Sequence, residues 1–171
     1  MRKVSLFIFL AVLWFAKQSS VFALEGNYAY VDIAKVFDEY QKTKDNDRTL
    51  QDAGKKKESE RDALVHDIRQ MKDELALLND DAKAKKQESM EGKIRELQAF
   101  DQKAKEELGK KRAEVVKEIF KDIDDTVKRY GERNGLDLVF NEKVLLYHSA
   151  KQDITTSVLD ELNKGYSKGK K

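Results

Sequence analysis

Apolar residues in the middle of the chain recur at the spacing of a coiled-coil seam. Two runs share this spacing, in which successive apolar residues mostly stand three or four positions apart. The first run consists of Leu64, Ile68, Met71, Leu75 and Leu78, and the second of Met90, Ile94, Leu97, Ala104 and Leu108. Polar and charged residues fill most positions between them. The pattern predicts two long helices that expose most of their surface to solvent.

The segment between the two runs suits a tight turn. Residues 79–81 (Asn-Asp-Asp) are of the types that cap the start of a helix. Folding the chain back between residues 80 and 81 places Met71 opposite Met90. We therefore expect an antiparallel helical hairpin whose tip lies near residues 79–82.

The residues before the hairpin indicate a strand followed by a short helix. Tyr28–Val31 is rich in residues that favour strands. Asp32 is a suitable helix cap, and Val36 and Tyr40 follow at helical spacing. This stretch therefore predicts the first part of a small folded body.

The residues after the hairpin indicate the rest of that body. Asn134-Gly135 suits a left-handed cap, so we expect the second long helix to end near Arg133. The apolar pattern then changes to that of strands at 136–140 and 144–147. We expect these two strands to pair as a hairpin, and the exposed edges of a three-stranded sheet invite pairing with other copies.

The predicted fold class is α+β, with a long antiparallel helical hairpin on a small β-body. We assign 24–43 and 113–163 to the body and 44–112 to the arm. The Gly- and Lys-rich residues 164–171 are predicted to be a flexible basic tail, after a last helix that starts near Asp153.

Composition excludes several kinds of functional site. Charged residues make up 39% of the 171 residues, and Pro and Cys are absent. A chain without Cys has no disulfide framework, thiolate zinc site or thiol nucleophile. Its two His residues, His66 and His148, are too few for a His-rich metal site. We expect neither an enzyme nor a cofactor or metal centre.

The N-terminus has the pattern of a secretory signal peptide. Arg2-Lys3 precede the 13-residue apolar run Val4–Ala16, which is too short for a typical membrane span. We expect residues 1–23 to be cleaved after Ala23, and a retained membrane anchor is the alternative. Cleavage lowers Lys and Arg from 34 to 31 against 32 Asp and Glu, so the mature chain is nearly neutral.

Sequence motifs at both ends of the mature chain resemble the Skp (OmpH-like) family of periplasmic chaperones. The motifs are Tyr28–Asp32 with Lys35-Val36-Phe37, Gly135–Val139, Val144–Tyr147, and Asp153-Ile154-Thr155 with Val158-Leu159. The resemblance implies a periplasmic homotrimer whose strands join in one body while three helical arms enclose a cavity. It also implies that the cavity holds unfolded outer-membrane β-barrel proteins without ATP.

If the chain forms this homotrimer, residues of the predicted body are expected to form the contacts between copies. They are Tyr28, Tyr30, Phe37, Val139, Phe140, Leu146 and Tyr147.

Four arm residues have predicted roles in handling clients. Leu77 and Phe100 are expected to be helical and to lie off the apolar seam, where they would contact a client. The alternative is that they pack across the hairpin. Gly54 and Gly109 fall at nearly the same height on opposite helices, and we expect a hinge there. The alternative is that exposed positions simply tolerate glycine.

Basic residues near the tip are candidates for contact with a lipid surface. Lys83, Lys85 and Lys86 are candidates for this contact, although a solvated helix face is the simpler explanation. A nearly neutral mature chain argues against specific nucleic-acid binding. The leading interpretation is an ATP-independent holdase, and the alternative is a structural or adaptor coiled-coil protein of the cell envelope.

Overall fold

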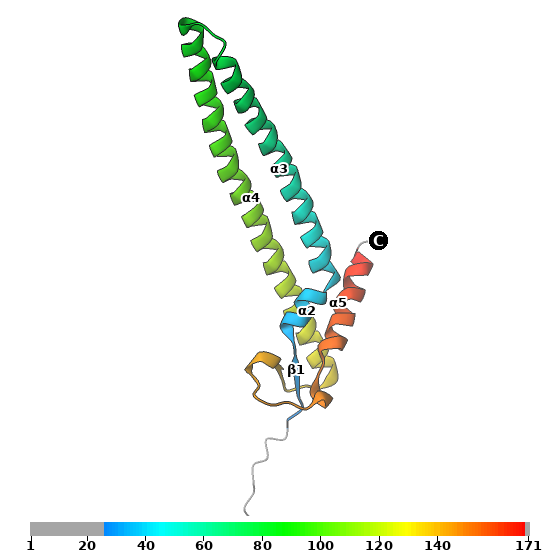
Figure 1. Ribbon diagram of the computed structural model, residues 1–171. Coiled ribbons are helices and arrows are strands. Elements are labelled where there is room, and N and C mark those ends of the chain that lie inside the picture. The colour runs from blue at the N-terminus through cyan, green and yellow to red at the C-terminus, as the bar shows by residue number, and fades with distance from the viewer. Residues whose placement is uncertain (1–25, 170–171) are drawn as a thin grey trace, which may run out of the picture.

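The structure is a computed structural model, and it describes residues 26–169. Two long helices form an arm that rises from a small body, as Figure 1 shows. In chain order the elements are β1 (Tyr28–Val31), α2 (Ile33–Glu39), α3 (Gln41–Leu75), α4 (Asp80–Asn134), β2 (Leu138–Asn141) and α5 (Thr155–Gly169). Two short 3₁₀ turns, η1 (Glu142–Val144) and η2 (Ala150–Gln152), lie between β2 and α5. The predicted signal peptide lies outside the described residues.

The helical hairpin predicted from the apolar periodicity is confirmed. α3 and α4 run side by side and are joined by a turn at residues 76–79. The Asn79 side chain caps α4 by accepting a hydrogen bond from the backbone N–H of Ala82 at 3.1 Å. Among the helices of residues 26–169, none combines the length and apolar character that crossing a membrane requires.

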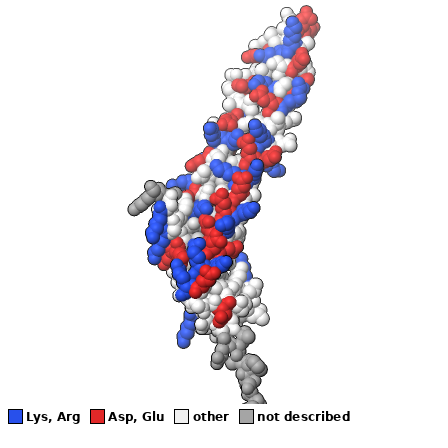
Figure 2. Space-filling model, turned by 180° about the vertical axis from the view of Figure 1, so that it is seen from behind, with Lys and Arg blue, Asp and Glu red and all other residues white. Residues whose placement is uncertain are grey.

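Ion pairs across the hairpin confirm the predicted alignment of its two helices. Arg61 Nε lies 3.0 Å from Asp101 Oδ1, and Glu74 pairs with Lys86 nearer the tip. Both pairs agree, within one residue, with a chain folded back between residues 80 and 81. Figure 2 shows acidic and basic side chains intermingled along the arm. The arm is therefore held by a narrow seam and by pairs of opposite charge.

The body contains a two-stranded sheet instead of the predicted three strands. β1 and β2 pair in parallel, with Tyr28 opposite Leu138 and Val31 opposite Asn141. The predicted strand at 144–147 and its β-hairpin are wrong. The Asn141 side chain accepts a hydrogen bond from the N–H of Lys143, which starts the turn η1 and ends the strand.

The helices α2, α4 and α5 pack together with this sheet to form the core of the body. Val36, Ile119, Ile123 and Val158 are each at most 1% exposed. Helix α5 continues through Gly169, so the predicted flexible tail is wrong for residues 164–169. The β-body is thus mainly helical.

Local signals set the ends of two helices as predicted. The Asp32 carboxylate accepts a hydrogen bond from the N–H of Lys35 at 3.0 Å, which caps α2. Gly135 has a φ of 62° and ends α4 in the left-handed region, where a side chain would be strained. These caps fix where α2 begins and where α4 ends.

Candidate functional site

A group of exposed apolar side chains follows the end of α4. We call it the apolar surface of the body, and it consists of Leu138, Phe140, Val144, Leu146 and Tyr147. Leu146 is fully exposed, and Tyr147 is 87% exposed. In Figure 2 the corresponding end of the molecule is mostly white, in contrast to the charged arm. An apolar patch of this kind on a charged protein indicates a contact with another molecule.

The backbone explains why this surface is uncovered. Leu138 and Phe140 alternate along β2, so their side chains lie on one face of the strand. Beside β2 is a groove of about 620 Å³, whose lining includes Ile33 and Val127. The next segment, residues 145–149, has no strand partner within residues 26–169 and leaves Leu146 and Tyr147 exposed.

His148 helps to hold this segment against the body. Its ring lies 4.1 Å from the ring of Tyr30, centroid to centroid, and its Nε2 is 3.3 Å from Glu142 Oε1. Glu142 is six positions earlier in the chain and is an acidic partner of the ring. The contact ties the loop between β2 and α5 to the sheet.

The residues predicted to join copies differ in exposure and fall into three groups. The exposed or partly exposed group, Phe140, Leu146 and Tyr147, belongs to the apolar surface. Tyr30 is 4% exposed and therefore packs inside its own chain. Tyr28, Phe37 and Val139 are half-buried, and the Phe37 ring stacks on that of Phe120 at 5.3 Å.

Sequence reasoning missed three exposed apolar residues of the body. They are Phe120, Leu138 and Val144, which are 43%, 51% and 69% exposed. The alternation of Leu138 and Phe140 was a signal that could have identified Leu138. Val144 could not be found in this way, because it was assigned to a strand that does not form.

The two predicted client-contact residues differ in their surroundings. Leu77 is 86% exposed and lies in the turn at the tip, so the prediction that it is helical is wrong. Phe100 is helical and half-buried, with the Lys57 ammonium 5.4 Å from its ring centroid. The contact with Lys57 on the opposite helix supports the alternative of packing across the hairpin for Phe100.

The two glycines proposed as a hinge lie inside continuous helices. Gly54 is within α3 and half-buried, and Gly109 is within α4 and exposed. A Cβ atom added at either position would have nothing within 4 Å outside its own helix backbone. Packing therefore does not require glycine at either position, and the hinge stays a prediction.

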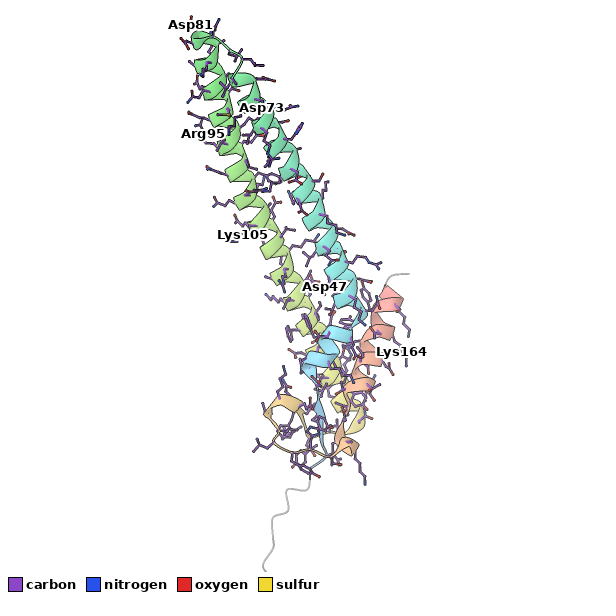
Figure 3. All side chains as sticks on the ribbon, in the orientation of Figure 1. Asp47, Asp73, Asp81, Arg95, Lys105 and Lys164 are labelled. Atoms are coloured by element: carbon purple, nitrogen blue, oxygen red, sulfur yellow. The ribbon has the colours of Figure 1, made fainter. Side chains whose placement is uncertain are left out.

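One of the three basic residues near the tip forms an ion pair within the arm. Lys86 pairs with Glu74 across the hairpin, whereas Lys83 and Lys85 are exposed. Asp81, labelled in Figure 3, lies at the tip beside them in sequence. Opposite charges are thus mixed here, and the lipid contact stays a prediction.

A polar cluster joins the two arm helices where they enter the body. Lys42 Nζ donates to Asp122 Oδ2 at 2.8 Å and lies 3.5 Å from Glu118 Oε2. The Tyr40 hydroxyl also donates to Asp122, at 3.3 Å. Burial opposes the charge of Lys42, but the hydrogen bond and charge of Asp122, with those of Glu118, outweigh it and raise the Lys42 pKa. Burial, followed by the Asp122 charge, raises the pKa of Tyr40.

Between residues 26 and 169, no three His, Asp or Glu side chains are grouped so that they could hold a metal ion. His66, on the arm, is exposed. The features that stand out are the apolar surface of the body and the long charged arm.

Comparison with known proteins agrees with this architecture. The family described as "Outer membrane protein (OmpH-like)" matches residues 27–162. A search of curated proteins finds no match. The fold is similar to a crystal structure of a candidate outer membrane chaperone (OmpH-like) from Caulobacter crescentus CB15, with a TM-score of 0.76 and 11% identity. The similarity covers 82% of this chain and 85% of the other.

The family match spans the strand β1, the whole arm, β2 and α5 up to Leu162. It therefore includes the sequence motifs on both sides of the helical hairpin and the hairpin itself. The predicted resemblance to the OmpH-like family is confirmed. This chain belongs to the OmpH-like family.

Proposed function

We propose that this protein is an ATP-independent holdase chaperone of the periplasm, which acts as a homotrimer. In this proposal the leader is removed after Ala23, and three copies join through the apolar surface of the body. Their arms then surround unfolded outer-membrane β-barrel proteins and keep them from aggregating. The observation that carries the proposal is an uncovered apolar surface at the base of a solvated arm.

The exposed apolar side chains favour association of the bodies. Burying apolar area contributes about 25 cal/mol per Å², so covering Leu146 and Tyr147 alone is favourable by a few kcal/mol. The neighbouring strand β2 pairs with β1 on one side, and a groove beside β2 adds further apolar lining. Every copy leaves the same residues uncovered, so three copies arranged around a threefold axis would cover this surface together.

The arm has the properties expected of a surface that holds clients loosely. Between residues 44 and 118 no side chain is buried, and the seam residues are at best half-buried. Leu77 offers an exposed apolar contact in the turn at the tip. Figure 2 shows charged side chains of both signs at this end of the arm. Weak contacts of this kind are individually replaceable, so a client can be released without the chemical energy of ATP.

The proposal can be tested by diluting an unfolded outer-membrane β-barrel protein out of denaturant. Light scattering is followed with and without the mature chain, added at an excess of trimer over client. We expect the mature chain to suppress aggregation. Unchanged aggregation would contradict the holdase proposal, and tight binding to a folded envelope protein instead would favour the adaptor alternative.

A double variant links this activity to the apolar surface. Leu146→Ser with Tyr147→Ser changes side chains that are exposed in the single chain, so its own fold is expected to persist. We expect sedimentation to show weaker association and light scattering to show weaker suppression. Lys151→Ala, at an exposed position of the same loop, is the matched control and should change neither measurement.

A further inference from the structure

The two arm helices enter the body in different ways. α4 passes from the tip into the body without a break, from Asp80 to Asn134. α3 is separated from α2 by one residue, Tyr40, whose ψ of 127° is extended. α3 therefore begins at a joint, whereas α4 continues without a break into the core of the body.

The first turn of α3 lacks a cap from its own sequence. A helix leaves its first N–H groups without partners in the helix, and the residue before it commonly supplies a side-chain acceptor. Tyr40 makes no such bond. Instead, Asn163 Oδ1 of α5 accepts a hydrogen bond from the backbone N–H of Gln41 at 2.9 Å. The cap of α3 is thus supplied by a residue 122 positions later in the chain.

The next turn of α5 contacts the same part of α3. The Tyr166 hydroxyl donates to Asp45 Oδ2 at 3.1 Å. Its ring packs edge-on against the ring of Tyr40, with 5.9 Å between centroids and 71° between planes. In Figures 1 and 3, α5 lies beside the start of α3, with Lys164 on its outer part.

We infer that the C-terminal turns of α5 form a latch that sets the direction of the arm. Asn163 and Tyr166 are its positioning residues, because they hold the first turn of α3 and the joint at Tyr40. On the α4 side, Lys42 is held by Asp122. With the latch in place the first turns of α3 are held by α5 as well as by α4 and α2, and without it the contacts with α5 are lost.

The length of the arm amplifies a small movement at this joint. At 1.5 Å per residue, a helix of 35 residues is roughly 50 Å long. A pivot of about 10° at the root therefore moves the tip by roughly 9 Å. The inference concerns the arm of the chain itself and does not depend on what the arm binds.

The test compares a latch variant with two matched controls. Asn163→Ala with Tyr166→Phe removes the cap and the hydroxyl but keeps the aromatic ring. Asn163→Asp retains an acceptor oxygen and should restore the cap. Lys164→Ala changes an exposed residue between the two latch residues, and it should have no effect.

Hydrogen exchange reports on the root of α3. We expect amides at residues 41–45 to exchange roughly 3- to 10-fold faster in the latch variant, the range expected when one helix cap is lost. Amides at 119–123, in the core part of α4, should exchange as before. Asn163→Asp and Lys164→Ala should leave both segments unchanged.

Spin-label distances report on the direction of the arm. The chain has no Cys, so Ser59→Cys on α3 and Ser157→Cys on α5 give a unique pair of labels. An excess of unlabelled chain keeps the pair within one copy. We expect the distribution to broaden by roughly 5 Å in the latch variant, as a pivot of about 10° on this lever predicts.

Faster exchange together with broader distances supports the latch. Unchanged exchange overturns it, and so does faster exchange with unchanged distances, because α5 would then only cap α3. If the double variant melts at much lower temperature, Tyr166→Phe alone should still broaden the distances, and an unchanged distribution would overturn the proposal. A failed aggregation assay would leave these readouts intact.

Discussion

The body and the arm of this protein are stabilised in different ways. In the body, α2, α4 and α5 bury Val36, Ile119, Ile123 and Val158 almost completely. In the arm, from residue 44 to residue 118, no side chain is buried at all. The body therefore has a collective core, whereas each turn of the arm depends mainly on its neighbours and on the facing helix.

Because of this difference, substitutions in the body and in the arm should affect stability differently. A change in a shared core is felt by every element that packs against it. A change in a two-helix arm is felt mainly by the adjacent turns, because stability can vary along a structure in local units. Substitutions of the same kind in the two regions should therefore have unequal effects.

The largest expected difference comes from introducing a charge. Val139 on β2 packs against the core cluster and is half-buried, so Val139→Asp places an unpaired carboxylate in apolar surroundings. We expect a loss of about 3 kcal/mol or more, with the proposed trimer dissociating and unfolding in one transition. Sedimentation and circular dichroism, followed together, measure both events.

Leu64→Asp in the arm is the matched substitution for Val139→Asp. Leu64 is also half-buried, but only the facing helix covers it. We expect faster hydrogen exchange near residue 64 with the assembly retained. A folded monomer of Val139→Asp, or dissociation of Leu64→Asp, would contradict the proposed division between body and arm.

Removing an ion pair should also cost more stability in the body than in the arm, although both losses should be smaller than that of Val139→Asp. The Lys42 and Asp122 side chains are 21% and 34% exposed, whereas those of Arg61 and Asp101 are 47% and 44% exposed. We expect Lys42→Met to cost about 1–3 kcal/mol and Arg61→Met roughly 0.2–1 kcal/mol. Denaturant unfolding measures both losses, and equal values would contradict the contrast.

The raised pKa of Lys42 gives this pair a pH dependence. Because the folded pKa lies above the ordinary value of 10.5, the stability it contributes is complete below that pH. It is lost as the pH rises through the folded pKa. As the pH rises above 10.5, wild-type protein should therefore lose more stability than Lys42→Met.

The same division explains what could be predicted from sequence. The arm follows from a local apolar period, and the caps at Asp32 and Gly135 follow from residue type. The pairing of β1 with β2 joins Tyr28 to Leu138 across the length of the arm. Adjacent apolar runs favoured a local hairpin instead, because sequence proximity was the only available guide to strand pairing.

The contacts of the last helix were hidden for a similar reason. Gly and Lys in residues 164–171 indicated a flexible tail, but Tyr166 contacts Tyr40 and Asp45. These partners are more than 120 positions away in sequence, so no local pattern reveals them. Leu77 illustrates the opposite error, since continuing the helical period through the tip missed the turn.

Replacing the two arm glycines should stabilise the arm. Neither Gly54→Ala nor Gly109→Ala meets another atom within 4 Å, so each should gain up to about 1 kcal/mol of helix stability. If the glycines form a hinge, the double variant should also show a narrower spread of tip-to-tip distances between spin labels at residue 80. Greater stability with an unchanged spread would exclude the hinge.

The smallest expected effect distinguishes two roles for Phe100. Its half-buried ring and its contact with Lys57 predict that Phe100→Ser lowers stability by up to about 1 kcal/mol. The sole Trp of the chain, Trp14, is in the predicted leader, so Trp fluorescence of a bound client reports binding to the mature protein. Normal client affinity with a lower melting temperature would assign Phe100 to the seam of the arm. Reduced client affinity at an unchanged melting temperature would assign Phe100 to client contact. Leu77→Ser is the reference variant, because Leu77 is exposed and its substitution leaves the packing of the arm intact.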